Sequence, residues 1–422
     1  MKTLKYIFQK FIGIKDDGNK VVITNKRNGE WIKLSLNAFI IFQDIMQEKI
    51  SFNNLKEKDR QFFQSLLKKL EKIGAIRLEK TCESESNNQS YNTRPLVTFS
   101  VCDRCNLNCK HCSYAKNFNK NQESDINNII SIIDEILKIN PKMISITGGE
   151  PLMRKDFYLI FDYLRKNFLG ELVLMTNGTL INENNIDIIT KTFNSIDMSI
   201  DGINEDTCSQ IRGKGVFLKV INSIKLLQKY DYNNISLSMV LTGNNYIYRD
   251  SFYDLCKKLE VKAITREFIP MGNGDENYEE LNLSKEILID DFNNEKIKAI
   301  SEKKIDPTYI KCTSCKAGFV ELFINESGDV YPCPLLVDDK LYMGNIIKKT
   351  INLDKYIKEK KFINSSIAKR IENSKPEKCK SCLIEDFCWK CPAYLYNTVN
   401  DEVYFNQMCS YNKKYLEPII WR

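Results

Sequence analysis

The sequence has a single histidine, His111, and this scarcity narrows the chemistry open to the chain. Histidine-based zinc sites, catalytic triads and histidine general bases lose most of their support when only one imidazole exists. Long apolar runs are also missing, because no segment approaches the roughly 18 residues that span a bilayer. The N-terminal stretch MKTLKYIFQKF lacks the apolar core and small-residue cleavage site of a signal peptide. We therefore expect a cytoplasmic protein without a membrane partner.

The chain also lacks a dense block of positive charge. Its 62 Lys and Arg residues and 55 Asp and Glu residues leave a net charge of +7 that is spread over 422 residues. The N-terminal segment shows no interleaving of aromatic and basic residues, so a nucleic-acid partner is not expected. Apolar residues at 43% and charged residues at 28% are ordinary for a globular protein, and the length allows two or three domains.

By contrast, the sequence contains fifteen cysteines. In a reducing compartment, so many cysteines favour metal or redox chemistry over a disulfide framework. Their positions relative to the expected elements therefore decide what the protein does.

The first part of the chain, residues 1–80, has the pattern of a small winged-helix-like domain. The short β-prone runs 21–24 and 31–34 flank Asn28-Gly29, which is a hairpin signal. Two amphipathic helices follow, the first with Ser35 as N-cap and the second ending at Gly74, and residues 75–78 return as a strand. Residues 81–94, which include Cys82, have almost nothing to bury and are expected to form a linker.

Residues 95–304 alternate short apolar strands with helices such as 126–139 and 216–229. The expected strands are 96–101, 143–147, 172–176, 196–200, 235–242 and 263–269. Near-continuous apolar strands in βα repeats predict a parallel sheet covered by helices. Six such units predict an α/β fold, a partial (β/α)6 TIM-like barrel whose active groups lie at the C-terminal strand ends. Residues 305–422 do not continue this alternation of strands and helices, and they are expected to form a separate cysteine-rich domain that needs metal to hold its fold.

Two motifs follow the first two strands of this barrel. The loop after the first strand carries Cys105, Cys109 and Cys112 with C-x3-C-x2-C spacing, and the second strand ends in Gly148-Gly149-Glu150-Pro151. Three thiolates leave one iron of a four-iron cluster open to a small ligand, whereas zinc would need Cys102 or His111 as a fourth ligand. The paired glycines would let the backbone approach a small ligand, and the Glu carboxylate would meet an amine. The two motifs together favour the cluster.

The segments CNLNCKHC and TGGEP resemble the radical S-adenosylmethionine (SAM) enzymes, over roughly residues 95 to 300. The resemblance implies that Cys105, Cys109 and Cys112 hold a [4Fe–4S] cluster whose open iron binds the amino and carboxylate groups of SAM. It places His111 beside the adenine rather than among the ligands. The resemblance also implies SAM contacts at Gly148, Gly149, Glu150, Asn177, Ser199 and Arg212, and for the last three ordinary loop capping is the alternative.

Eight further cysteines lie between residue 312 and the C-terminus. Paired C-x2-C knuckles are typical of a zinc ribbon, which stays open as an alternative. The spacing around Gly328 resembles the SPASM extension of radical SAM enzymes, which carries two auxiliary [4Fe–4S] clusters. The resemblance assigns one cluster to Cys312, Cys315, Cys333 and Cys391, and the other to Cys379, Cys382, Cys388 and Cys409. Whether the first of these is fully ligated by cysteine is left open.

The order hairpin, helices and strand ahead of such a body resembles the leader-peptide recognition domains of ribosomally made, modified peptides. These domains bind an extended leader by adding it as a strand to the hairpin edge. The resemblance implies a maturase of the sactipeptide or ranthipeptide type. A 5′-deoxyadenosyl radical would abstract hydrogen from a ribosomal precursor peptide, and the enzyme would install a thioether or, as second choice, a carbon–carbon crosslink. Its partners would be a precursor peptide with its leader and a flavodoxin or ferredoxin electron donor.

Three alternatives remain beside this interpretation. One is an anaerobic sulfatase-maturing-type enzyme, and another is an enzyme that makes a cofactor from a peptide precursor. The third is a non-catalytic zinc or iron–sulfur regulator that acts through its winged helix. No general base is assigned, because the sequence offers a single histidine.

Overall fold

The structure is a computed structural model that describes residues 6–9, 11–78, 94–115, 124–282, 310–318, 320–359, 375–388, 391–398 and 402–421. The chain forms two compact units, each discontinuous in sequence. One unit takes its residues from Met1–Asn92, Leu288–Lys316 and Asn373–Arg422, and the other from Thr93–Ile287 and Ala317–Glu372. Cys82 and nearly all of the expected linker 81–94 lie outside the described residues. Within the described ranges, no helix is long and apolar enough to cross a membrane.

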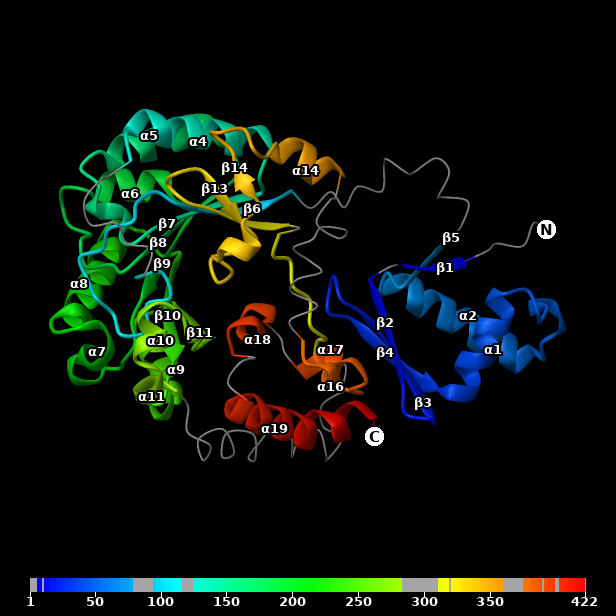
Figure 1. The fold of residues 1–422 in the computed structure, drawn as a ribbon. Coiled ribbons are helices and arrows are strands. Elements are labelled where there is room, and N and C mark those ends of the chain that lie inside the picture. The colour runs from blue at the N-terminus through cyan, green and yellow to red at the C-terminus, as the bar shows by residue number, and fades with distance from the viewer. Residues whose placement is uncertain are drawn as a thin grey trace. The chain divides into compact units, whose positions relative to one another are not determined.

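The larger unit is built on a parallel sheet. Six neighbouring strands pair in the order β11-β10-β9-β8-β7-β6, and every pair among them is parallel. Their bounds are β6 Leu96–Ser100, β7 Met143–Thr147, β8 Glu171–Thr176, β9 Ser195–Ser199, β10 Ile235–Leu241 and β11 Lys262–Glu267. This arrangement confirms the partial (β/α) barrel, and Figure 1 shows the strands with helices along their outer side.

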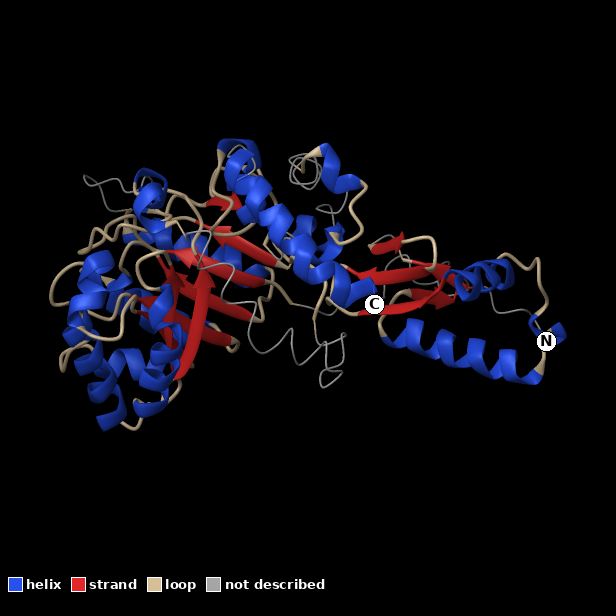
Figure 2. Ribbon diagram, turned by 90° about the horizontal axis from the view of Figure 1, so that it is seen from below, coloured by secondary structure: helices blue, strands red, loops and turns tan. Residues whose placement is uncertain are grey.

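The helices of this unit cover the sheet because each has one apolar face. In α4, the isoleucines Ile129, Ile132, Ile133 and Ile136 recur at helical spacing and all are fully buried. The Asp125 side chain accepts a hydrogen bond from the Asn127 amide and begins that helix. The helices are α4 Ile126–Lys138, α5 Phe157–Asn167, α6 Ile186–Thr192, α7 Glu205–Arg212, α8 Val216–Lys229, α9 Arg249–Lys258, α10 Asn273–Glu276 and α11 Tyr278–Leu281, and the 3-10 turns are η3 Pro151–Met153 and η4 Tyr246–Tyr248. Figure 2 shows these helices around the red strands.

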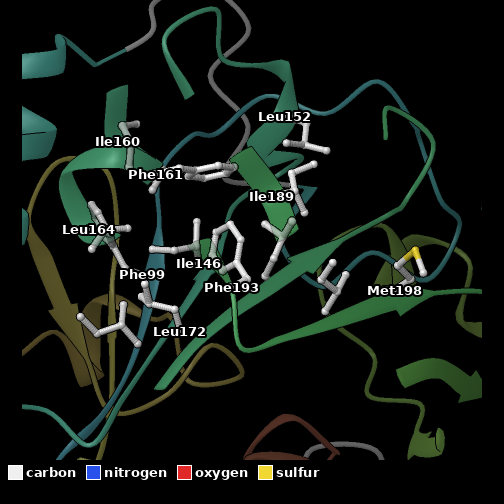
Figure 3. Close-up of a cluster of buried hydrophobic side chains, with 14 of the residues drawn as sticks. Phe99, Ile146, Leu152, Ile160, Phe161, Leu164, Leu172, Ile189, Phe193 and Met198 are labelled. Carbon is white, nitrogen blue, oxygen red and sulfur yellow. The ribbon is translucent and has the colours of Figure 1, made fainter. Parts of the chain in front are cut away.

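The core between sheet and helices is dense. Phe161 of α5 and Phe193 meet edge to face with ring centroids 4.7 Å apart. Phe99 of β6 and Ile146 of β7 point from the sheet into the same cluster, as Figure 3 shows. The buried thiols Cys208 and Cys256 belong to this core, so they act as small apolar side chains rather than ligands.

The sheet continues into residues that the sequence places in the cysteine-rich domain. Strand β12 (Glu321–Ile324) pairs with β6 in parallel, with Leu322 opposite Val97. Its edge carries β13 (Asp329–Tyr331) and β14 (Gly344–Asn345), and this region also holds the 3-10 turn η6 (Asp339–Leu341) and α14 (Leu353–Glu359). An unpaired, apolar edge on β6 would be costly, and β12 covers it. Part of the expected 305–422 domain therefore belongs to the barrel unit.

The smaller unit begins with an antiparallel sheet of three strands, β2 (Ile12–Asp16), β3 (Lys20–Asn25) and β4 (Trp31–Ser35). The helices α1 (Leu36–Met46) and α2 (Glu57–Lys72) follow, with the 3-10 turn η1 (Phe52–Asn54) between them. Strand β5 (Ile76–Leu78) returns and pairs with β1 (Tyr6–Phe8). The Ser35 hydroxyl accepts from the Ala38 amide as predicted, and Gly74 ends α2 with a φ of +70°. The hairpin, the two helices and the returning strand are confirmed, while β1 and β2 were not predicted.

The C-terminal segment packs on this same sheet. Its helices are α16 Glu377–Lys380, α17 Glu385–Cys388, α18 Pro392–Thr398 and α19 Glu402–Trp421. Val22 and Trp31 share a buried cluster with Phe387 and Ile420, whereas Val21 belongs to the cluster with α1 and α2. Because successive side chains of a strand point to opposite faces, β3 is buried on both sides.

Candidate functional site

The cysteine loop after β6 is fixed to the end of β7 by backbone hydrogen bonds. The amide of Gly149 donates to the Cys102 carbonyl at 2.9 Å, and the amide of Glu150 donates to the Arg104 carbonyl at 2.8 Å. A Cβ on Gly148 would lie 2.4 Å from the Cys102 carbonyl oxygen, and one on Gly149 would lie 2.1 Å from that of Arg104. The paired glycines are therefore required for contact between the two loops, a reason that the sequence alone does not reveal.

One cavity of about 280 Å³ opens at this edge of the barrel. It brings together the three cysteines of the first motif and five of the six predicted SAM-contacting residues. These cavity-lining residues are Cys105, Cys109, Cys112, Gly148, Gly149, Asn177, Ser199 and Arg212, and His111 lines it as well. These residues come from the ends of four strands, β6 to β9, or from the segments that follow them, and they converge on one space, as expected at the C-terminal face of a barrel.

Each of the three cavity cysteines meets N–H donors. The Leu107 amide donates to Cys105 Sγ at 3.4 Å, and the Arg212 Nη1 donates to Cys109 Sγ at 3.8 Å. Amide hydrogen bonds from the loop beyond Cys112 lower the pKa of that thiol, although burial raises it more. N–H donors aimed at sulfur stabilise thiolates bound to iron and tune the potential of a cluster. The donor set therefore fits an iron–sulfur cluster on Cys105, Cys109 and Cys112.

Cys102 is distinguished from these three by its surroundings. Its thiol donates to the Glu150 carbonyl at 3.2 Å and does not line the cavity. Burial raises the pKa of Cys102 to about 12, which keeps the thiol protonated. Burial raises the pKa of Cys109 to about 12 as well, but a metal displaces such a proton when the thiol faces it. Cys102 thus acts as a hydrogen-bonded support of the loop.

Glu150 has a different environment from the one predicted for it. Its side chain is fully buried and is not among the cavity-lining residues. Oε1 accepts from the Leu152 amide at 3.1 Å and from the Thr176 hydroxyl at 2.7 Å, and Oε2 accepts from the Asn177 amide at 2.7 Å. Burial raises the pKa of Glu150, while these donors favour its charged form. The carboxylate ties β7 to the end of β8, and its contact with the SAM amine stays a prediction.

A buried charge network lies beneath the cysteine loop. Asp201 is fully buried, and one of its oxygens meets both the Arg212 Nε and the His111 Nε2 at 2.5 Å. Burial by itself would raise the pKa of Asp201, but the Arg212 guanidinium and the His111 ring lower it to about 2. Arg212 is thereby held against Cys109. Asp201 was missed as a functional residue, although a carboxylate directly after an apolar strand was a visible signal.

The four cysteines predicted for the second auxiliary cluster all belong to the smaller unit. Cys379 and Cys388 each interact electrostatically with Cys382 and Cys409, so the four sulfurs lie near one another. The Asn412 side-chain amide donates to Cys388 Sγ at 3.3 Å. This grouping and its N–H donor fit a four-thiolate cluster.

The four cysteines predicted for the first auxiliary cluster are divided between the units. Cys312, Cys315 and Cys391 lie in the smaller unit, whereas Cys333 follows β13 in the larger unit. The Cys312 amide donates to the Gly29 carbonyl at 2.9 Å, so the β3–β4 turn holds this residue in place. Its ligand set therefore stays a prediction.

A mononuclear zinc site and a four-iron cluster place different demands on the spacing of their cysteines. Four ligands at about 2.3 Å from zinc place their sulfur atoms within about 4 Å of one another. Across the described ranges, no group of three or more Cys, His, Asp or Glu side chains is arranged to chelate one metal ion. In a four-iron cluster each thiolate binds a different iron, so the sulfurs are farther apart.

The parallel barrel and its three-cysteine loop define a class of enzyme that couples an iron–sulfur cluster to a small chelating ligand. The radical SAM superfamily model matches residues 99–256, and the SPASM model, an iron–sulfur cluster-binding domain, matches residues 312–383. The chain belongs to the radical SAM superfamily and is an enzyme with a SPASM domain. Its cofactors are a SAM-binding [4Fe–4S] cluster, auxiliary iron–sulfur clusters and SAM.

Three comparisons illustrate this relationship. Mycofactocin maturase MftC of Mycolicibacterium smegmatis is 26% identical over 263 residues, which is 60% of this chain and 67% of that protein. An uncharacterized protein of Methanocaldococcus jannaschii is 31% identical over 268 residues, 60% of this chain and 89% of its own length. The crystal structure of Streptococcus suis SuiB bound to precursor peptide SuiA is similar in fold, with a TM-score of 0.51 and 16% identity over 93% of this chain and 99% of SuiB.

Proposed function

We propose that this chain is a maturase that modifies a ribosomally made precursor peptide. The observation that carries the proposal is the combination of a three-cysteine cavity in one unit with a small sheet in the other, whose outer strands have no further strand partner among the described residues. The cavity supplies the reaction site, and the sheet supplies a place for an extended peptide. The alternative of a non-catalytic regulator is not retained, because the family is enzymatic.

The side chains around the cavity position the groups that a radical reaction needs. When bound, the cluster and SAM supply a 5′-deoxyadenosyl radical that abstracts a hydrogen atom from the substrate. Arg212 and the loop amides hold the three thiols, and the buried Asp201 holds Arg212. Met175 and Val240 line the same cavity and make part of its wall apolar.

The small sheet supports a peptide substrate. Strand β3 lies between β2 and β4, and each of these outer strands has β3 as its only partner in the described sheets. Both faces of the sheet are covered, so its strand edges are the surfaces left for main-chain hydrogen bonds. A leader peptide added to such an edge would be held in extended form.

Two relatives agree with this substrate class. One of them is named a mycofactocin maturase, and SuiB has been crystallised with its precursor peptide SuiA. The likeness to SuiB supports the fold alone, since the identity is 16%. We extend from these names the expectation of a precursor peptide partner, and not the identity of the peptide.

The product that we propose first is a thioether between a peptide cysteine and a carbon, and a carbon–carbon crosslink is the second choice. The auxiliary clusters would accept the surplus electron when the new bond closes. A flavodoxin or ferredoxin as electron donor and a cytoplasmic location stay predictions from the sequence.

The proposal is tested with anaerobically reconstituted enzyme, SAM, a reductant and synthetic peptides made from the short open reading frames that neighbour its gene. We expect the peptide to lose two hydrogens for each crosslink, with 5′-deoxyadenosine formed in step. Mass spectrometry of the peptide measures the loss, and iodoacetamide labelling separates the two products, because a thioether consumes a thiol and a carbon–carbon bond does not. Formation of 5′-deoxyadenosine with an unchanged peptide, leader included, would contradict the proposal.

A further inference from the structure

A polar pair on the sixth and fourth strands faces the same cavity and has no part in holding the cysteines. Arg266 of β11 and Asp197 of β9 both line the cavity, as does Ser238 of the strand between them. Arg266 Nη2 donates to Asp197 Oδ2 at 2.8 Å, and Arg266 Nε donates to Ser238 Oγ at 2.8 Å. Two fixed hydrogen bonds thus orient the plane of the guanidinium.

The pair also presents unused hydrogen-bonding atoms. The Asp197 residue is 9% exposed, its Oδ1 is buried, and the Ser236 hydroxyl of the neighbouring strand β10 is a donor to this carboxylate. The Arg266 side chain is 48% exposed, and its Nη1 makes no hydrogen bond within the described ranges. A carboxylate oxygen accepts more than one hydrogen bond, so Asp197 can take a further donor while Arg266 Nη1 offers one.

The charge of the site indicates what that partner is. Asp197 and Arg266 neutralise each other, so a charged ligand group would be left without a counter-charge in a buried place. A neutral group with one donor and one acceptor fits both unused atoms. A main-chain amide is such a group, because its N–H can donate to Oδ1 and its carbonyl can accept from Nη1.

We propose that Asp197 and Arg266 bind a main-chain amide of the substrate peptide beside the carbon that loses hydrogen. This inference rests on the proposed function and names the part of the cavity that holds the substrate. The pair fixes the peptide by its backbone, so it selects a position on the chain rather than one kind of side chain.

The test compares Arg266→Met and Asp197→Asn with the wild type, using as the probe a synthetic peptide, from a short open reading frame that neighbours the gene, that the wild type modifies. Formation of 5′-deoxyadenosine without peptide is measured first, and modified peptide per 5′-deoxyadenosine second. We expect the first to stay within about twofold and the second to fall about tenfold, with KM for the peptide raised. Arg165→Met is the matched control, because Arg165 pairs with Asp162 on the surface of α5.

Each other outcome overturns the assignment. An equal loss of 5′-deoxyadenosine with and without peptide would mean that the pair serves SAM or the fold. Unchanged product formation would mean that the pair does not touch the substrate. A wild type that cleaves SAM but leaves the peptide unmodified would overturn the proposed function, and the role of the pair with it. Arg266→Lys, which keeps one donor, should recover part of the product if the pair binds an amide.

A second observation, independent of the first, concerns the smaller unit. Asp386 of α17 lies between two predicted cluster ligands, Cys382 and Cys388, and is 4% exposed. Its Oδ2 accepts from the Thr24 hydroxyl at 2.6 Å, and its Oδ1 is 2.8 Å from Lys26 Nζ. Both partners belong to the β3 region of the front sheet.

The front sheet is shaped to receive this carboxylate. A Cβ on Gly13 of β2 would lie 2.2 Å from Asp386 Oδ2, so only glycine allows the contact. The neighbouring Glu385 pairs with Lys15 of the same strand at 2.9 Å. The Asp386 carbonyl accepts from the Thr313 amide at 2.6 Å, which ties it to the segment of Cys312 as well.

We infer that the front sheet is a structural part of the auxiliary-cluster region and that Gly13, Thr24 and Lys26 are positioning residues for its cysteines. Without the sheet, Asp386 loses its hydroxyl donor and its cation, and the neighbouring Phe387 loses its packing against Trp31. Deletion of residues 1–80 would therefore remove more than a peptide-binding module, and loss of activity on deletion does not by itself identify a leader site.

The test uses Gly13→Ala and the double variant Thr24→Val/Lys26→Met in the full chain. Iron per chain is measured after anaerobic reconstitution, together with the rate at which a chelator removes it and the electron paramagnetic resonance of the reduced clusters. Gly18→Ala is the matched glycine control, because its Cβ would meet nothing within 4 Å and its φ of +88° carries the strain alone. Lys49→Met is the matched lysine control, because Lys49 pairs with Asp44 in α1 and is 64% exposed.

We expect about one third of the iron to leave at least fivefold faster in both test variants, with the signal of one auxiliary cluster altered. Formation of 5′-deoxyadenosine without peptide should persist, which shows that the barrel is folded. Thr24→Ser keeps the hydroxyl and should behave as the wild type. Iron release at the control rate, or equal loss from all clusters together with SAM cleavage, would overturn the inference.

Discussion

The buried carboxylate of Glu150 allows a prediction that separates a structural role from a cofactor contact. We expect Glu150→Gln to destabilise the barrel unit even when SAM is absent. The amide of glutamine can still accept hydrogen bonds through its oxygen, but its NH2 group would face a donor in place of one carboxylate oxygen. The affected donors are the Leu152 amide, the Thr176 hydroxyl and the Asn177 amide.

The magnitude follows from these three contacts. A hydrogen bond to a charged group contributes about 1.5–3 kcal/mol, and a buried donor left unpaired costs about 1–3 kcal/mol. Replacing one accepting oxygen by a donor therefore lowers the free energy of unfolding by about 3 kcal/mol. For a unit of this size, 1 kcal/mol shifts the melting temperature by about 2–4 °C, so we expect a decrease of about 6–12 °C.

The assay is a thermal melt of reconstituted protein under anaerobic conditions, with and without SAM. Glu171→Gln is the matched control, because Glu171 begins β8 and is exposed. A Glu150→Gln melt that equals the control without SAM, and falls below it only when SAM is added, would refute the structural role. It would assign the carboxylate to the SAM amine instead.

Three further substitutions follow from the same geometry. Gly149→Ala forces a Cβ to within 2.1 Å of the Arg104 carbonyl, so we expect the cysteine loop to move and cluster iron to fall by about one third, measured as iron per chain. Asp201→Asn leaves Arg212 buried without its counter-charge and should lower the free energy of unfolding by about 3 kcal/mol or more. The pKa of Asp201 is about 2 in the folded state and 3.8 in the unfolded state, so melting at pH 5 and at pH 8 should show the same loss. Glu326→Gln should behave differently, because burial raises the pKa of Glu326 to about 7 from 4.5. The wild type loses stability as pH rises from about 4.5 to about 7. The free energy of unfolding of the variant should therefore match that of the wild type near pH 4.5 and exceed it by up to about 3 kcal/mol at pH 8. Equal melting temperatures of the two proteins at both pH values would contradict the raised pKa of Glu326.

The barrel could be predicted from the sequence because its signals are local. Each expected strand lies within two residues of the observed one, since a buried parallel strand is a short apolar run bounded by turns. The helix 216–229 has the same bounds in the structure. The cysteine loop and the glycine pair were also visible, because both directly follow strands whose ends meet at one edge of the sheet.

Long-range pairings could not be predicted in this way. Nothing local in residues 321–324 indicates that they pair with β6 rather than with a neighbour in their own domain. The role of Asp386 depends on Thr24, which is 362 positions away in sequence. Glu150 illustrates the same limit. Its motif indicates that it lies at the end of the second barrel strand, but the hydrogen-bond donors to its carboxylate depend on how β8 packs beside β7.

The measurement that tests the central claim most directly is isotope transfer from the peptide to SAM-derived product. Synthetic peptides from the short open reading frames that neighbour the gene are made with fully deuterated residues and incubated with reconstituted enzyme, SAM and reductant. The account predicts 5′-deoxyadenosine that carries one deuterium, together with a peptide that has lost two hydrogen isotopes per crosslink. Unlabelled 5′-deoxyadenosine beside an intact deuterated peptide would contradict the claim that this chain is a peptide maturase.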